Sequence, residues 1–202
     1  MCIRDRYYGL VDAVHEDPDA ALRLVTVGLI DPLRSAWGER PCRFSKRTFR
    51  HPAVDLDRVD DAIAVWVRRR LRPKVLVASQ TRVLEAVVDL DGTLVPSVPV
   101  VSVEPVGSAP SLWHVAALLT SPVSTVISLL AGAGTAMSAD AIRVSASSLA
   151  SLPLPLDRDG WDEAAAAASN GDVAGCGAAM LAAHGIADRG DLFDFWWGRL
   201  PN

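Results

Sequence analysis

A run that opens with Lys74-Val75-Leu76-Val77-Ala78-Ser79-Gln80-Thr81-Arg82 and extends to Pro155 decides the fold of this chain. Stretches rich in Val and Leu predict three strands, over residues 74–79, 82–88 and 94–103. The intervening Asp89-Leu90-Asp91-Gly92-Thr93 predicts a hairpin turn, because glycine takes positive φ without steric cost. These strands predict a small mixed or antiparallel sheet.

The segment after this sheet carries no charged residue between Glu104 and Asp140. A membrane span needs about 20 mainly apolar residues with flanking anchors. Serines and threonines interrupt this segment, and no Lys or Arg flanks it, so we expect no membrane contact. Two buried helices are predicted instead, over 112–119 and 122–130, with Ser121 as N-cap and Pro122 at the first helical position.

The flanking segments extend the pattern in both directions. Upstream, the sequence predicts a helix over 18–33, an ordered basic loop with a short extended piece over 37–52, and a helix over 55–71. Downstream of Pro155, Ala-rich helices are predicted over 161–169 and 173–184, followed by an aromatic helix over 191–200. The expected fold class is α+β: a small mixed or antiparallel sheet with packed helices, followed by an Ala-rich helical C-terminal segment.

Charge is unevenly distributed along the 202 residues. The net charge is −4, yet the stretch from Arg34 to Arg82 holds 13 Lys or Arg against 5 Asp or Glu, a balance of +8. The rest of the chain therefore carries −12. A local basic patch is what contact with a polyanion requires, because phosphate neutralisation depends on the patch and not on the total. The alternative is a solvated face that is merely rich in arginine.

Cysteine and histidine usage indicates neither a disulfide framework nor a metal site. Cys2, Cys42 and Cys176 lie far apart, and the four histidines are isolated, so we expect no metal and a reducing, cytoplasmic location. The first six residues, Met1-Cys2-Ile3-Arg4-Asp5-Arg6, resemble a translated adapter sequence and lack the apolar core of a signal peptide. We expect residues 1–6 to be a non-native leader and the chain to be the C-terminal part of a larger protein.

Three motifs carry a family resemblance. In chain order they are the 74–82 run, Leu119-Thr120-Ser121 within a helix, and Ile142-Arg143-Val144-Ser145 followed by Leu152-Pro153-Leu154-Pro155. Together they resemble the C-terminal target-recognition region of Taq-type N6-adenine DNA methyltransferases, of the type II or IIG restriction-modification kind. The resemblance covers roughly the central 40 % of the chain on these motifs.

The resemblance implies a site-specific DNA methyltransferase from which the catalytic half is missing here. In that family an N-terminal Rossmann-like domain binds S-adenosylmethionine and carries an Asn-Pro-Pro-aromatic motif, and this chain contains neither feature. The fragment alone is therefore expected to bind no cofactor and to carry no catalytic residue. Its expected partners are double-stranded DNA and the missing N-terminal catalytic domain in cis. The implied division is a leader (1–6), the end of the catalytic domain with a basic connector (7–60), the target-recognition domain (61–156) and a helical C-terminal segment (157–202).

Seven residues are predicted to contact DNA: Arg43, Lys46, Arg47 and Arg50 on the basic loop, and Lys74, Gln80 and Arg82 around the first strands. Arg and Gln can read guanine and adenine edges with two hydrogen bonds, whereas the other cations would hold phosphates. Arg68, Arg69 and Arg70 rank lower, because a helix C-terminus attracts cations for structural reasons alone. Arg143 could either stabilise the fold or touch the DNA backbone.

Two other function classes remain open. The run Val87 to Leu94, with Asp89 and Asp91, resembles the nucleophile loop of haloacid-dehalogenase-type phosphatases. That chemistry also needs a cation on the phosphoryl group and further carboxylates for magnesium, and no lysine follows Lys74, so a turn is preferred. The second alternative is a helical protein-interaction domain built on Trp196 and Trp197, whose aromatics otherwise pack as core.

Overall fold

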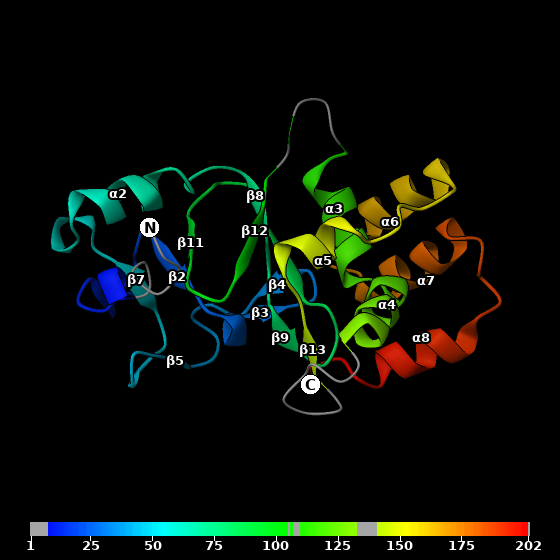
Figure 1. Cartoon of the computed structure of the whole chain (residues 1–202), viewed down its shortest axis with the longest axis horizontal. Helices are drawn as coiled ribbons and strands as arrows, with labels where there is room; N and C mark the ends of the chain where they lie inside the picture. The colour runs from blue at the N-terminus through cyan, green and yellow to red at the C-terminus, as the bar shows by residue number, and fades with distance from the viewer. Residues whose placement is uncertain (1–7, 105, 107–109, 133–140, 202) are drawn as a thin grey trace.

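The chain adopts an α+β fold, as predicted. The structure, a computed structural model, describes residues 8–104, 106, 110–132 and 141–201. Small sheets and helix α2 (Asp61–Arg68) occupy one side of the molecule, and the helices from α3 (Leu112–Thr120) onward occupy the other. Strands β8 (Lys74–Val77) and β12 (Val101–Val103) lie near the boundary between them (Figure 1). The predicted leader, residues 1–6, lies outside the described residues.

A four-stranded sheet forms most of the N-terminal side. Its spatial order is β1 (Val14–Glu16), β7 (Pro52–Val54), β2 (Arg23–Val25) and β11 (Leu94–Pro96). The β1–β7 and β7–β2 pairs are antiparallel, and β2 and β11 are parallel. The helix predicted over 18–33 is wrong, because this segment forms β2, a short 3-10 turn (Val27–Leu29) and β3 (Ile30–Asp31). Leu24 and Val25 are buried between distant strands, and this tertiary pairing overrides the local helical spacing.

A three-stranded antiparallel sheet lies at the centre. Its order is β10 (Ala86–Asp89), β8 (Lys74–Val77) and β12 (Val101–Val103). The first predicted strand is confirmed, and the second is confirmed in its last part, because β10 begins only at Ala86. The third is split into β11 and β12, which belong to different sheets. Pro96 and Pro99 explain the break, because proline has no N–H to donate to a strand ladder.

The Asp89–Thr93 segment is a turn, as predicted, but it joins two sheets and is no hairpin. Gly92 takes φ +69°, and a Cβ there would lie 2.6 Å from the backbone nitrogen of Arg72. Only glycine fits this position, because positive φ and the close backbone approach both exclude a side chain. The turn therefore passes the chain from β10 in the central sheet to β11 in the N-terminal sheet.

The helices predicted after the sheet are confirmed, and the structure adds α5 (Ala146–Ala150), which was not predicted. They are α3 (Leu112–Thr120), α4 (Pro122–Gly132), α5 (Ala146–Ala150), α6 (Arg158–Ser169), α7 (Val173–Ala183) and α8 (Gly190–Trp197). The Ser121 hydroxyl accepts a hydrogen bond from the backbone N–H of Ser124 at 3.1 Å, so it caps α4 as predicted. No single helix of the described part is long and apolar enough to span a membrane; α3 and α4 together would be, but the chain bends by 57° between them.

Two hydrophobic cores lie on opposite faces of the central sheet. Val75 and Val77 of β8 contact the core that contains α3, α6 and α7, whereas Leu76 and Ala78 contact the core of the N-terminal sheet. This alternation follows from the two-residue period of a strand. The helix α2 (Asp61–Arg68), which begins inside the predicted 55–71 helix, packs on the N-terminal core.

Both cores run across the predicted domain boundaries. The N-terminal core joins Val54 to Ile63 across the 60/61 boundary. The helical core joins Leu152 to Trp161 across the 156/157 boundary. The Ala-rich C-terminal helices therefore share a core with the central strands.

Candidate nucleic-acid interface

The structure brings two of the sequence motifs together as a strand pair. Strands β9 (Gln80–Thr81) and β13 (Ile142–Arg143) are antiparallel, and Gln80 lies directly opposite Arg143. The carbonyl of Ser79 accepts a hydrogen bond from the N–H of Val144 at 3.0 Å, which continues the pairing. Gln80 and Arg143 are both exposed. Two polar side chains, each able to form paired hydrogen bonds, thus lie together on the surface.

A cavity of about 510 Å³ lies beside this strand pair. Four segments line it: Trp66 and Arg70 from the end of α2, Ser79 and Gln80, the 96–102 connection with Glu104, and Arg143 to Ala146. The segments are far apart in the sequence, and no local pattern marks the cavity. Sequence analysis therefore missed Trp66 and Glu104 as lining residues, and Arg70, which it ranked lower, also lines the cavity.

Fixed polar contacts shape the rim of this cavity. The guanidinium of Arg70 lies 4.3 Å from the centre of the Trp66 ring, and its Nη1 donates to the Trp66 carbonyl oxygen at 3.1 Å. Across the rim, Arg72 Nη1 lies 3.3 Å from Glu104 Oε2. The lining includes the guanidinium groups of Arg70 and Arg143, the amide of Gln80 and the carboxylate of Glu104. This mixture suits a ligand that has both anionic and hydrogen-bonding parts.

Three predicted cations lie on a projecting hairpin. Strands β5 (Cys42–Phe44) and β6 (Arg47–Phe49) pair around the two-residue loop Ser45-Lys46. Phe44 and Phe49 are buried, whereas Arg43, Lys46 and Arg47 are exposed. Arg47 lies 4.8 Å from the centre of the Phe49 ring. The hairpin occupies half of the loop predicted over 37–52.

The backbone of this hairpin loop adopts the left-handed conformation. Ser45 has φ +46° and Lys46 has φ +66°. Tight two-residue hairpins of the type I′ class need positive φ at both central residues, and Asn-Gly usually supplies it. Here Ser45 and Lys46 adopt positive φ, which is strained for residues with a side chain. The Lys46 side chain therefore lies at the tip of the hairpin.

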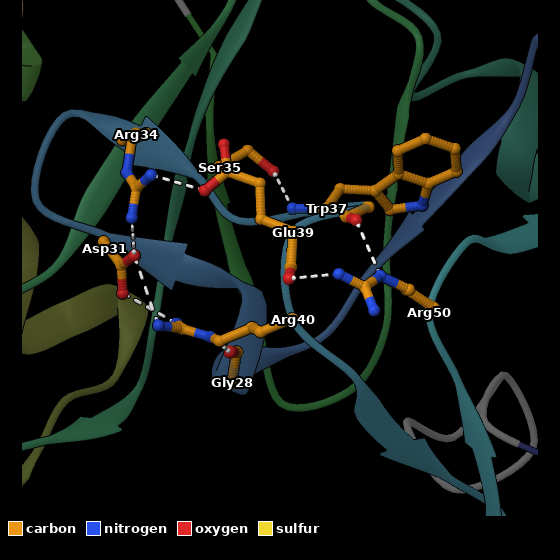
Figure 2. A network of polar contacts seen from close by, with 9 residues as sticks. Gly28, Asp31, Arg34, Ser35, Trp37, Glu39, Arg40 and Arg50 are labelled. Carbon is orange, nitrogen blue, oxygen red and sulfur yellow. Dashed lines mark hydrogen bonds and ion pairs between the residues drawn. The ribbon is translucent and has the colours of Figure 1, made fainter. Parts of the chain in front are cut away.

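Arg50 is exposed and forms hydrogen bonds within the fold. Its Nε donates to the Gly38 carbonyl and its Nη2 to the Glu39 carbonyl, each at 3.1 Å. These bonds hold the loop before β5 in place (Figure 2). Two of the three guanidinium nitrogens of Arg50 are thus engaged within the fold, and its contact with DNA stays a prediction.

A second structural network surrounds Asp31, which is buried. Arg34 lies 3.1 Å and Arg40 lies 2.7 Å from its carboxylate oxygens, and Arg40 Nε also donates to the Gly28 carbonyl at 2.7 Å (Figure 2). Burial raises the pKa of the Glu85 carboxyl to about 8, an effect that Asp31 increases and Arg40 opposes. Part of the basic stretch is therefore neutralised within the fold.

Lys74 is a clear correction to the predicted DNA contacts. Its side chain is fully buried and forms an ion pair with Asp89, and its Nζ also donates to the Arg72 carbonyl at 3.3 Å. Burial lowers the pKa of the Lys74 ammonium, against the opposing effect of Asp89. The ammonium cannot reach a phosphate. Arg82, by contrast, is exposed beside β9, as a DNA contact requires.

The same ion pair removes the basis for the phosphatase alternative. The Asp89 carboxylate is buried, pairs with Lys74, and accepts hydrogen bonds from the N–H groups of Thr93 at 3.1 Å and Leu94 at 3.0 Å. A nucleophile must be open to its substrate, whereas this carboxylate supports a turn. Within the described ranges, no group of three or more His, Cys, Asp or Glu is placed to hold a metal ion.

The interaction-domain alternative loses one of its two residues. Trp196 is fully buried, with its ring against Gly177, where a Cβ would lie 2.6 Å from it. Trp197 is 47 % exposed and stacks on Phe193 at 5.8 Å. Trp196 therefore packs as core, as the sequence first suggested.

No protein-family model matches the chain, and no curated protein does.

Proposed function

We propose that this chain is the DNA-recognition part of a site-specific adenine-N6 DNA methyltransferase of the restriction-modification kind. It holds and reads duplex DNA, and a separate domain in cis, which binds S-adenosylmethionine, transfers the methyl group to a flipped adenine. The observation that carries the proposal is the pairing of Gln80 with Arg143. Two motifs that suggested the family are neighbours in the fold and present their polar residues on one surface.

The charge distribution supports a division of labour within the proposed interface. Arg43, Lys46 and Arg47 on the β5–β6 hairpin are exposed cations that suit phosphates. Gln80 has a side chain that can form paired hydrogen bonds with an adenine edge, whereas Arg143, opposite it, offers a guanidinium that suits a phosphate of the DNA backbone. Phosphate contacts fix register, and base contacts give sequence preference. The two sets therefore predict different mutant phenotypes.

The first test removes the phosphate set. In the 202-residue chain, Arg43→Ala with Lys46→Ala should weaken duplex binding and flatten the plot of log affinity against log salt by about 2, because each lost phosphate contact removes about 0.9 from the slope. Fluorescence anisotropy with a labelled duplex measures both quantities. The matched control, Arg158→Ala with Arg189→Ala, removes the same charge from helical segments on the other side of the molecule and should change neither quantity.

The second test addresses sequence preference. Selection of bound duplexes from a randomised pool should yield a consensus for the unchanged chain and a relaxed consensus for Gln80→Ala. A double variant on the hairpin that binds with unchanged affinity and salt slope would contradict the proposal. So would a chain that fails to bind duplex DNA at low salt.

A further inference from the structure

The cavity beside β9 and β13 has the composition of a nucleotide site. One wall is apolar and comes from the 96–101 connection, which includes Val98, Pro99 and Val100. Polar groups come from Gln80, Arg143 and Ser145, which also line the cavity. Its volume of about 510 Å³ lies within the range of ~300–1,000 Å³ typical of small-molecule sites. A single nucleotide fits such a space, whereas a duplex does not.

Arg70 supplies a flat cationic surface at one end of this cavity. Its guanidinium lies 4.3 Å from the Trp66 ring centre, and its bond to the Trp66 carbonyl fixes the group in that position. Unstacked bases commonly pack on aromatic rings and on guanidinium planes. A lysine could supply the charge but not the plane.

Hydrogen-bonding groups for a base edge and for a phosphate are present around the same space. Gln80 has both a donor and acceptors, and Glu104 adds an acceptor that Arg72 holds at the rim. Arg143, opposite Gln80, offers a guanidinium that suits a phosphate. The base-stacking, edge-binding and phosphate-binding groups thus converge from four separate segments.

We infer that this cavity binds one nucleotide turned out of its stack. The base lies on the Arg70 guanidinium with its edge toward Gln80, and the phosphate lies at Arg143. The inference rests on the proposed function, because a DNA duplex is the source of the nucleotide. It adds that recognition includes an unstacked nucleotide held in this domain.

A direct test uses mononucleotides and the intact chain. The four deoxynucleoside 5′-monophosphates are titrated into ¹⁵N-labelled protein, with inorganic phosphate as a separate probe. At least one nucleotide should shift the amide signals of residues 79–80 and 143–146, with a dissociation constant on the order of 1 mM. Inorganic phosphate should bind at least about tenfold more weakly, because it lacks the base.

Three variants separate the roles of the lining residues. Gln80→Ala and Arg143→Ala replace exposed side chains and should each weaken nucleotide binding by about tenfold. Arg70→Lys keeps the charge and loses the plane, so it should weaken nucleotides while leaving phosphate unchanged. Arg189→Ala, on an exposed residue paired with Asp191, is the control and should have no effect.

Duplex binding measured in parallel separates the two proposals. A chain that binds duplex DNA but shows no nucleotide shifts would overturn the cavity assignment and leave the proposed function intact. Phosphate binding as tight as nucleotide binding would overturn it too. Nucleotide binding that is lost in Gln80→Ala, in a chain that does not bind duplex DNA, would support the cavity and contradict the proposed function.

Discussion

The basic stretch from Arg34 to Arg82 contains two groups of cations with opposite surroundings. Arg34, Arg40 and Arg50 are bound to carboxylates or backbone carbonyls and hold the loops around β3 and β5 together (Figure 2). Arg43 and Lys46, a few residues away, stand exposed on the β5–β6 hairpin. A local charge count therefore overstates the charge that a ligand meets. What matters is whether each cation already has a partner within the fold.

The largest expected effect is at the most buried cation. Lys74→Ala should lower the free energy of unfolding by about 3–5 kcal/mol, because it leaves the buried Asp89 carboxylate without its partner. Urea denaturation followed by circular dichroism measures this change. Lys46→Ala, the exposed counterpart, should stay within about 0.5 kcal/mol of the unchanged chain. An equal loss of unfolding free energy in the two variants would contradict the distinction between buried, paired cations and exposed ones.

A pH effect should come from Glu85, next to the Asp31 network. Its pKa of about 8 in the fold is raised from 4.5, so the folded chain holds a proton that the unfolded chain has lost. Stability is then greatest below about pH 4.5 for this group and falls as pH rises toward 8.

The measurement is the free energy of unfolding against pH. For the unchanged chain, this free energy should drop by about 2 kcal/mol between about pH 5.5 and about pH 7.5, relative to Glu85→Gln. Glu85→Gln has no titrating group at this position and should lack this slope. The same slope in both proteins would show that Glu85 titrates normally. Arg40→Ala should enlarge the drop in the free energy of unfolding, because Arg40 opposes the raised pKa of Glu85.

The smallest expected effect is at Lys46 on the β5–β6 hairpin, where stability and DNA binding should change in opposite directions. Lys46→Gly should stabilise the fold by about 0.5–1 kcal/mol, because glycine takes positive φ without the strain that lysine bears. The same change should weaken DNA binding through one lost phosphate contact. Thermal unfolding and fluorescence anisotropy measure the two effects. Loss of stability in Lys46→Gly would show that the lysine side chain supports the hairpin.

Local signals predicted the elements that depend on local interactions. The helices α3 and α4 follow from an uncharged apolar run and from a serine cap at Ser121, whose bond to Ser124 lies within one turn. Strands β8 and β10 follow from their Val-rich runs, and their antiparallel pairing joins segments close in the chain. The α+β class could therefore be predicted from the sequence.

Pairing between strands far apart in the sequence explains which predicted elements were wrong. Residues 18–33 have a helical spacing of apolar residues, but β2 pairs with β7 and with β11, which lies about seventy positions later. The run 94–103 looked like one strand because its two halves are equally apolar, although they join different sheets. The pairing of β2 leaves no trace in a short window of sequence, whereas Pro96 and Pro99 are a local sign of the break between β11 and β12.

The candidate site divides in the same way. The sequence by itself determined which residues could recognise nucleic acid, since Arg, Lys and Gln carry the donors and charges wherever they lie. Only the tertiary structure decided how each of them is placed. Lys74 is buried against Asp89, Arg50 donates to the Gly38 carbonyl, and Gln80 lies opposite Arg143. The physical reason is that burial and partnership depend on segments far apart in the chain, whereas side-chain chemistry depends on one residue alone.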